Sequence, residues 1–362
     1  ESDFDRICWG IGAGSFRMLY FSEVLPFFGE GKNSFCNEAN TRVAATMAAM
    51  RERGQDPLDI ALAFCRRHGM GFWANDRICH CWPPGGFNDD FAAPFYLQNQ
   101  HLRTVNADGH REATLSLAHR EFQDLKISLY RELAERGVDG IYIDLQRKPG
   151  LMGIDEPVAA AFEKKTGRRP EKSDYRTETW LTIRAGFVTD FMRRVRSALD
   201  DVGARQNRRI ELAAQGFAGR MYTGNAVVDE NMMQGYDIGT WAQEGLIDIF
   251  APSTSRHYQP VSLLAFADML NDTECSLWGC LGQHHDSLLP SDYNHSVYFG
   301  NDPQKRITPI ADLDPLRVMR NAADFYAQGA QGVFLWEAGE VPNCPVRWDH
   351  LRTLGHREKW RR

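Results

Sequence analysis

Short apolar segments alternate with longer stretches of helical periodicity along the whole chain. Seven apolar runs have the length and the residue types of buried strands. These runs cover residues 6–11, 70–74, 138–145, 209–214, 246–251, 275–280 and 332–336. Helical spacing or helix-capping residues predict helices at residues 57–69, 119–136, 177–199, 237–244, 260–270 and 315–329. This alternation predicts parallel strands joined by right-handed helical crossovers.

Two architectures fit this order, a closed barrel and an open doubly wound sheet. A doubly wound sheet usually carries a glycine-rich phosphate turn after its first strand, but residues 10–20 (GIGAGSFRMLY) lack the GxGxxG spacing and predict a tight turn. We therefore predict an α/β fold, a (β/α)8 TIM-type barrel with long active-site loops, formed by residues 1–362 as a single domain. Seven strands are one short of closure. Either residues 114–118 supply the eighth strand, or the first strand is irregular or lies upstream of Glu1.

Composition narrows the range of partners. The chain is 43% hydrophobic and 25% charged, which is typical of a soluble globular protein with a large core. No run approaches the ~18 uncharged apolar residues of a membrane helix, and the net charge of −6 gives no general attraction to nucleic acid. No CxxC pair occurs among the eight cysteines, which disfavours a zinc ribbon or a thioredoxin-type site. No cofactor and no bound metal are expected. The compartment and the oligomeric state, including a homodimer, stay open.

Polar residues follow the predicted strands at their carboxyl ends, where barrels of this type hold their active sites. The residues in these positions are Asn75, Asp76, Arg77 and His80 after the second strand, Asp144 and Arg147 after the third, His284 after the sixth, and Trp336 and Glu337 at the end of the last. Carboxylates are few among them. Since glycosidic cleavage needs one group to protonate the leaving oxygen and another to activate water or attack the sugar, these carboxylates are the first candidates.

Three residues are predicted to be catalytic. Asp144 ends a buried run, so its carboxylate either reaches the mouth or forms a structural ion pair with Arg147. Glu337 follows Trp336, and an aromatic ring beside a carboxylate suits a sugar, whose apolar face stacks while its hydroxyls need acceptors; a structural Glu is the alternative. His80 is a candidate base, because an imidazole ordinarily titrates near neutral pH.

Substrate binding is assigned to residues near these three. Arginine presents a rigid fork of donors that matches a carboxylate, so Arg77 and Arg147 predict an acidic sugar such as a sialic or uronic acid. Pairing of each arginine with a neighbouring acid is the alternative. The predicted substrate-binding residues are Arg77, Arg147, Asn75, Asp76, Trp336 and His284.

Three segments carry a resemblance to a known group. Residues 138–149 (VDGIYIDLQRKP), 235–253 and 329–340 resemble bacterial glycosyl hydrolase-like TIM-barrel proteins, near glycoside hydrolase family 156, the exo-sialidases. The resemblance spans about residues 5–355 and implies that Arg77 and Arg147 bind substrate while His80 acts as base. The chain departs from that family in two places. The aspartate that serves as acid at the end of the first strand has no counterpart, and Glu337 stands where relatives tend to have asparagine.

The resemblance favours an enzyme that hydrolyses O-glycosyl bonds, and two other interpretations stay open. One is a carbohydrate-binding barrel that has lost catalysis. The other is a metal-dependent hydrolase that uses His284, His285 and Asp286, although adjacent residues rarely chelate one ion well. A chitinase is excluded, because its DGxDxDxE pattern laid on residues 139–146 finds Tyr142 and Gln146 in place of two acids.

Overall fold

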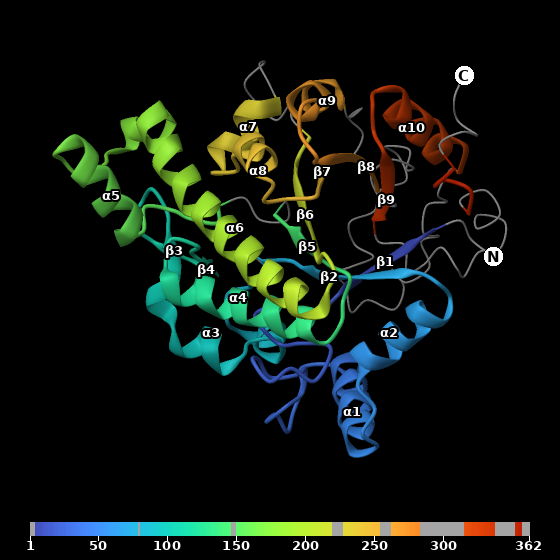
Figure 1. Cartoon of the computed structure of the whole chain (residues 1–362). Coiled ribbons are helices and arrows are strands. Elements are labelled where there is room, and N and C mark those ends of the chain that lie inside the picture. The colour runs from blue at the N-terminus through green and yellow to red at the C-terminus, as the bar shows by residue number, and fades with distance from the viewer. Residues whose placement is uncertain are drawn as a thin grey trace.

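One curled sheet of parallel strands organises the molecule (Figure 1). The computed structural model describes residues 4–78, 80–145, 150–218, 227–253, 262–282, 315–336 and 352–356. The sheet has the order β1 (Arg6–Gly10), β2 (Gly71–Asp76), β5 (Gly140–Asp144), β6 (Glu211–Phe217), β7 (Ile249–Ser253), β8 (Ser276–Gly282) and β9 (Gly332–Trp336). All seven predicted strands are confirmed. They pair in chain order, as parallel strands with helical crossovers do.

Side chains from all seven strands meet inside the curl. This inner cluster consists of Cys8, Trp73, Tyr142, Ala213, Ile249, Ala251, Trp278, Cys280 and Phe334. The Phe334 ring stacks on Tyr142 with 4.9 Å between centroids, so β9 contacts β5 across the interior. Trp73 stacks on Trp278 at 5.5 Å, which joins β2 to β8 in the same way. These contacts make the sheet a curled half-barrel of the TIM type with a packed interior, in place of a flat sheet with helices on both faces.

The helices lie on the outer side of the sheet, and some of them cover it while others project from the barrel. They are α1 (Glu38–Glu52), α2 (Pro57–Arg67), α3 (Pro94–Gln98), α4 (Arg120–Glu135), α5 (Glu156–Thr166), α6 (Glu178–Gln206), α7 (Val227–Met233), α8 (Ile238–Gln243), α9 (Leu264–Leu270) and α10 (Pro315–Ala327). The Asp56 side chain caps α2 by accepting from the Leu58 amide at 2.8 Å. Helix α1 was not predicted, because its alanine-rich sequence has no apolar stripe, and among its residues only Asn40, Ala44 and Met47 are buried.

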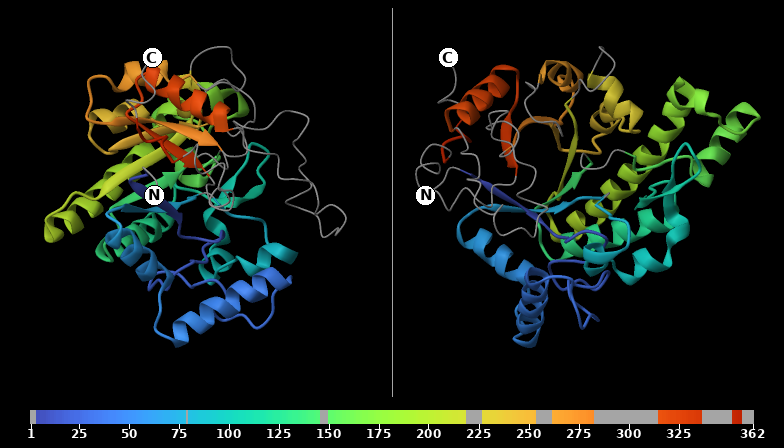
Figure 2. Two further views of the ribbon diagram at one scale, coloured as in Figure 1. Left: turned by 90° about the vertical axis from the view of Figure 1, so that its right-hand side faces the viewer. Right: turned by 180° about the vertical axis from the view of Figure 1, so that it is seen from behind.

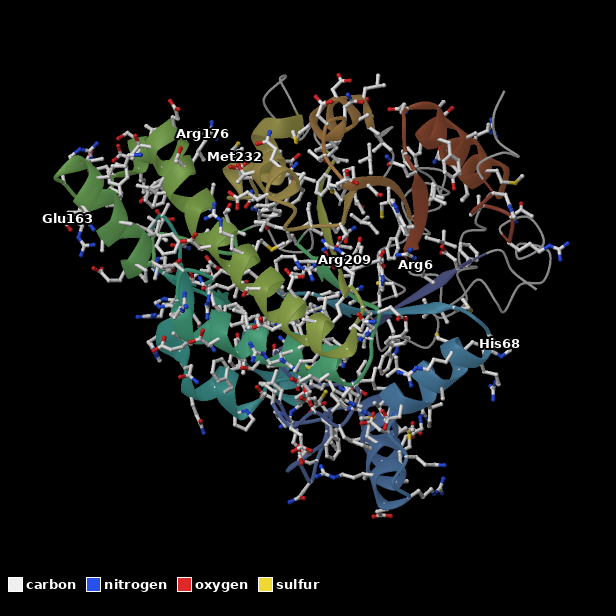
Figure 3. The ribbon with its side chains drawn as sticks, viewed as in Figure 1. Arg6, His68, Glu163, Arg176, Arg209 and Met232 are labelled. Atoms are coloured by element: carbon white, nitrogen blue, oxygen red, sulfur yellow. The ribbon has the colours of Figure 1, made fainter. Side chains whose placement is uncertain are left out.

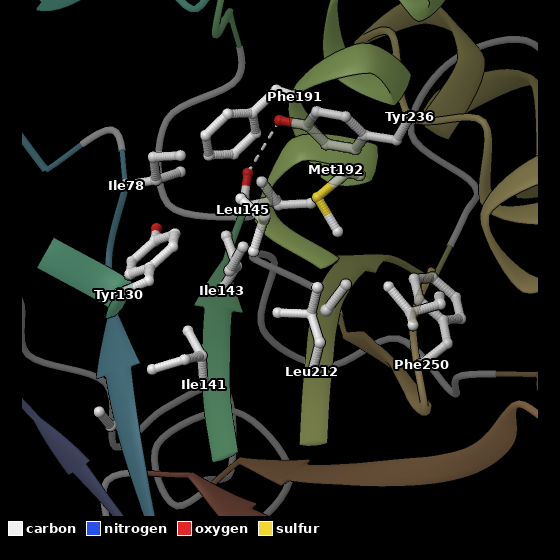
Figure 4. Packing of buried hydrophobic residues seen from close by; sticks show 14 of the residues in the cluster. Ile78, Tyr130, Ile141, Ile143, Leu145, Phe191, Met192, Leu212, Tyr236 and Phe250 are labelled. Atoms are coloured by element: carbon white, nitrogen blue, oxygen red, sulfur yellow. Dashed lines mark hydrogen bonds between the residues drawn. The ribbon is translucent and has the colours of Figure 1, made fainter. Parts of the chain in front are cut away.

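Alternate residues of each strand face these helices and form the main core. Figure 4 shows Ile143 of β5 beside Met192 of α6, with Phe191 of the same helix beyond it and Ile141 further down the strand. All four side chains are fully buried. In β5, every second side chain therefore faces the helices and is apolar, and the residues between face the barrel interior.

The segment between β2 and α4 forms a separate lobe with its own antiparallel hairpin, β3 (Arg103–Val105) and β4 (Arg111–Leu115). The prediction of an eighth barrel strand at residues 114–118 is therefore wrong, because this stretch enters the hairpin and pairs outside the barrel sheet. The amide of Ile154 donates to the carbonyl of Val105 at 2.7 Å. This bond ties the hairpin to the chain that follows β5.

Two helical extensions project from the barrel (Figure 2). Helix α1 lies beyond α2 at one end, and α5 with the first turns of α6 forms an arm. In Figure 3, Glu163 and Arg176 mark the outer part of this arm, far from the barrel interior. Among the described residues, the helices are too short or too polar to cross a membrane.

Candidate active site

The carboxyl end of β5 places a carboxylate at the inner edge of the barrel. Tyr142 packs in the barrel interior, and Asp144, two residues further along the strand, faces the same way. The register sets Asp144 beside Gln215 of β6. The Asp144 side chain is 0% exposed. The predicted catalytic carboxylate Asp144 thus lies at the edge of the sheet where the active sites of such barrels are found.

Arg77 reaches this carboxylate from the neighbouring strand. It directly follows β2, and its Nε lies 3.6 Å from Oδ2 of Asp144. About a third of the Arg77 side chain is exposed, so the guanidinium lies between the solvent and the buried acid. The structure therefore brings together Arg77 and Asp144, two of the residues assigned from sequence.

Asp76 lies outside this site, although it was assigned to substrate binding. Its carboxylate binds Nζ of Lys126 at 2.7 and 3.0 Å and accepts from the Tyr130 hydroxyl at 2.7 Å, both from α4. Because Trp73 faces inward, the alternation of β2 directs Asp76 outward. Asp76 is a structural residue that fixes the end of β2 to α4, and this corrects its assignment.

His80 sits on a turn that a strained loop holds in place. Its amide donates to the carbonyl of Arg77 at 2.9 Å, and its own carbonyl accepts from Ser15 at 2.8 Å. Ser15 has φ of 42° and Phe16 has φ of 72°, a conformation that non-glycine residues rarely adopt. The ring of His80 contacts Trp82 edge-on at 4.2 Å. A strained backbone of this kind persists only where its neighbours hold it in place. Here the strained loop at Ser15 holds the backbone of His80, the candidate base.

Polar groups line the interior just below Asp144. The buried Oδ1 of Asn75 and the hydroxyl of Tyr142 have no hydrogen-bonding partner among the described residues. Burial, with a smaller contribution from Asp144, raises the pKa of Cys8, and burial raises that of Tyr142 well above its ordinary value. The Cys8 thiol and the Tyr142 hydroxyl are therefore neutral, and the floor of the site below Asp144 carries no charge from either group.

Several predicted site residues lie outside the described residues, namely Arg147, His284, His285, Asp286 and Glu337. Trp336 ends β9, and its backbone alone is described. Within the ranges that the structure describes, no three His, Cys, Asp or Glu side chains are grouped as metal ligands would be.

Two charged residues with buried side-chain polar atoms were missed by sequence analysis. Arg103 of β3 stacks on Tyr96 with its guanidinium carbon 4.7 Å from the ring centroid. Its Nε and Nη2 are buried and have no hydrogen-bonding partner within the described ranges. Glu230 of α7 has a buried Oε2 that likewise lacks a partner there, and burial raises the pKa of Glu230. Neither residue follows a strand directly, so the strand-end pattern gave no signal for them.

The curled parallel sheet and its helices are of the TIM-barrel class, and the chain is similar to several solved structures. The glycoside hydrolase domain of PgaB (BpsB) from Bordetella bronchiseptica matches with a TM-score of 0.54 at 14% identity, over 97% of this chain and 88% of that one. A family 27 β-L-arabinopyranosidase from Geobacillus stearothermophilus matches with a TM-score of 0.48 at 10% identity, over 98% and 68%. A family 18 N-acetylglucosaminidase from Paenibacillus barengoltzii gives 0.42 at 12% identity, over 81% and 85%. No family model and no curated protein sequence matches the chain.

Proposed function

We propose that the chain is a glycoside hydrolase that acts on an acidic sugar. The observation that carries this proposal is the buried Asp144 at the inner carboxyl edge of the barrel, with the Arg77 guanidinium 3.6 Å away. Catalytic residues of barrel enzymes come from this edge, and glycosidic cleavage depends on carboxylates. The PgaB domain, a glycoside hydrolase domain by name, and the resemblance to family 156 support the same class of reaction.

In the proposed reaction, Asp144 accepts the proton of the water that attacks the anomeric carbon. His80, on the turn after β2, is the second described candidate for this base. The uncharged interior below Asp144 supports the role of Asp144. A low-dielectric environment strengthens the electrostatic interaction between this carboxylate and the positive charge that develops on the sugar ring.

The acidic sugar is inferred from Arg103 together with Arg77. A buried guanidinium nitrogen without an acceptor costs free energy, and a ligand carboxylate is the acceptor whose geometry fits it. The Tyr96 ring, on which the Arg103 guanidinium stacks, is itself held in place. Its hydroxyl lies 2.9 Å from the Trp82 carbonyl and 2.7 Å from the Ala113 carbonyl. Both arginines belong to the lobe between β2 and α4. This lobe borders the end of β5, where Asp144 lies.

Hydrolysis of a panel of 4-nitrophenyl glycosides tests the reaction class. The panel contains both anomers of glucuronic acid, N-acetylneuraminic acid, glucose and N-acetylglucosamine. Asp144→Asn is nearly isosteric but neutral and should lower kcat by at least ~10²-fold while the far-UV circular dichroism is unchanged. A wild-type protein that binds these sugars without hydrolysing them would instead support the carbohydrate-binding barrel.

The same panel tests the sugar class. Arg103→Gln should raise KM for the acidic glycosides by an amount equivalent to ~1–3 kcal/mol and leave neutral glycosides unaffected. Arg111→Gln is the matched control, since it removes an equal charge from the same hairpin at an exposed position. A wild-type preference for neutral glycosides would exclude the acidic sugar and keep the hydrolase.

A further inference from the structure

Glu230 lies on an element that is fastened to the ends of two barrel strands. Its neighbour Asn231 accepts from the amide of Phe217 and donates to the carbonyl of Phe217, both at 2.9 Å, and so holds α7 to the end of β6. After α7, the Tyr236 hydroxyl donates to the carbonyl of Leu145 at 3.1 Å, as Figure 4 shows. Leu145 directly follows Asp144. The segment that carries Glu230 therefore borders the strand ends where Asp144 lies.

The distance along the backbone is short. Consecutive Cα atoms are about 3.8 Å apart, so the Cα of Glu230 lies this far from the Cα of Asn231, the residue that contacts the end of β6. Met232, labelled in Figure 3, marks the position of this helix beside the barrel. Gly216 of β6 allows the close approach, because a Cβ there would lie 2.7 Å from Oδ1 of Asn231.

No described residue supplies a compensating charge to the Glu230 carboxyl group. Its Oε2 is buried and has no hydrogen-bonding partner among the described residues. Burial is the cause that raises the pKa of Glu230. Helix α6 packs against α7 and brings Arg184, whose guanidinium donates to the carbonyls of Met233 and Met152. Strand β6 contributes the neutral Gln215. An uncompensated carboxyl group at an active-site edge is the environment that keeps such a group protonated and able to donate.

We propose that Glu230 is the general acid that protonates the leaving oxygen in the reaction proposed above. The Glu230 proton moves to the glycosidic oxygen as the bond from C1 to that oxygen breaks, and the bonding electron pair stays on the oxygen. Water adds to C1 and passes its proton to Asp144. The products are the free sugar and an alcohol, and proton exchange with solvent restores both carboxyl groups. This role rests on the proposed function.

Leaving-group dependence tests the role of Glu230. Glu230→Gln is compared with the wild type on the 2,4-dinitrophenyl and methyl glycosides of the sugar that the panel identifies. Dinitrophenolate departs without a proton, whereas methanol needs one. The variant should therefore keep kcat within a few-fold on the first substrate and lose ~10²–10⁴-fold on the second. Glu244→Gln, directly after α8, is the matched control, since this residue is exposed and pairs with Arg193, and it should change neither rate.

The outcomes separate this role from the proposed function. Equal losses of Glu230→Gln on both substrates, or no loss on either, would overturn the general-acid role while wild-type turnover upholds the hydrolase. A wild type that hydrolyses no glycoside of the panel would overturn the proposed function and the role with it.

Discussion

The buried contact between Asp76 and Lys126 gives a sharp prediction for stability. The Lys126 side chain is 3% exposed and the Asp76 side chain 7% exposed, and Tyr130 donates a further hydrogen bond to the same carboxylate. The Lys126 ammonium also lies 5.1 Å from the centre of the Phe16 ring. Lys126→Met keeps the apolar stem but leaves the Asp76 charge buried with only one of its partners from α4. Removing one member of a buried ion pair costs ~3–5 kcal/mol, so the free energy of unfolding should fall by this amount.

Urea unfolding followed by far-UV circular dichroism measures the effect. Lys172→Met is the control, because Lys172 pairs with Asp108 at 2.6 Å on the surface and such pairs contribute ~0–1 kcal/mol. The double variant Asp76→Asn with Lys126→Met removes both charges and keeps an acceptor for Tyr130, so it should recover most of the loss. A Lys126→Met variant no less stable than Lys172→Met would refute the assignment of Asp76 as a structural anchor.

Two further predictions concern the lobe and Glu230. Gly153→Ala should cost ~1–3 kcal/mol in thermal or urea unfolding, because a Cβ there would overlap the carbonyl oxygen of Val105 and lie 2.7 Å from its carbonyl carbon. Gly186→Ala on α6 meets open space and should stabilise by up to ~1 kcal/mol; equal effects would contradict the argument. Since burial raises the folded-state pKa of Glu230, its contribution to stability is present below the ordinary pKa of about 4.3 and is lost as pH rises through the folded-state pKa. Glu230→Gln should therefore gain stability over the wild type as pH rises above about 4.3, and a constant difference from pH 4 to 8 would contradict the raised pKa.

Residues at strand ends were predictable from sequence because two simple rules fix them. Apolar runs define the strands, and parallel strands bring their carboxyl ends to one edge, which located Asp144 and Arg77. The assignment of Asp76 failed because the adjacent Phe72 and Trp73 are both large and apolar, so the sequence alone does not decide which face of β2 is turned inward. In β2 the large apolar Trp73 faces inward, so Asn75 faces inward and Asp76 must face the helices.

Arg103 and Glu230 could not be found in this way. Their positions depend on tertiary contacts of the lobe and of α7, through Val105 with Ile154 and through Asn231 with Phe217. These contacts join residues on different elements, and neither hydrophobic period nor spacing predicts them. Helix α5 was missed for a related reason, since its arm packs on α6 and lies away from the barrel.

The two ends of the barrel use similar groups in opposite ways. At the amino-terminal end of the strands, Nη1 of Arg6 binds Oε2 of Glu211 at 2.6 Å, and Trp73 donates to the same oxygen at 3.1 Å. The guanidinium carbon of Arg6 lies 4.7 Å from the Trp73 ring centroid and 5.3 Å from that of Trp278. This carboxylate and guanidinium satisfy each other, which suits a structural plug. At the other end, Arg103 and Glu230 hold buried polar atoms that no described residue satisfies. Buried polar groups without partners cost stability, and a protein can retain them where a bound ligand supplies the missing hydrogen bonds. This contrast favours the carboxyl edge of the sheet as the site of catalysis.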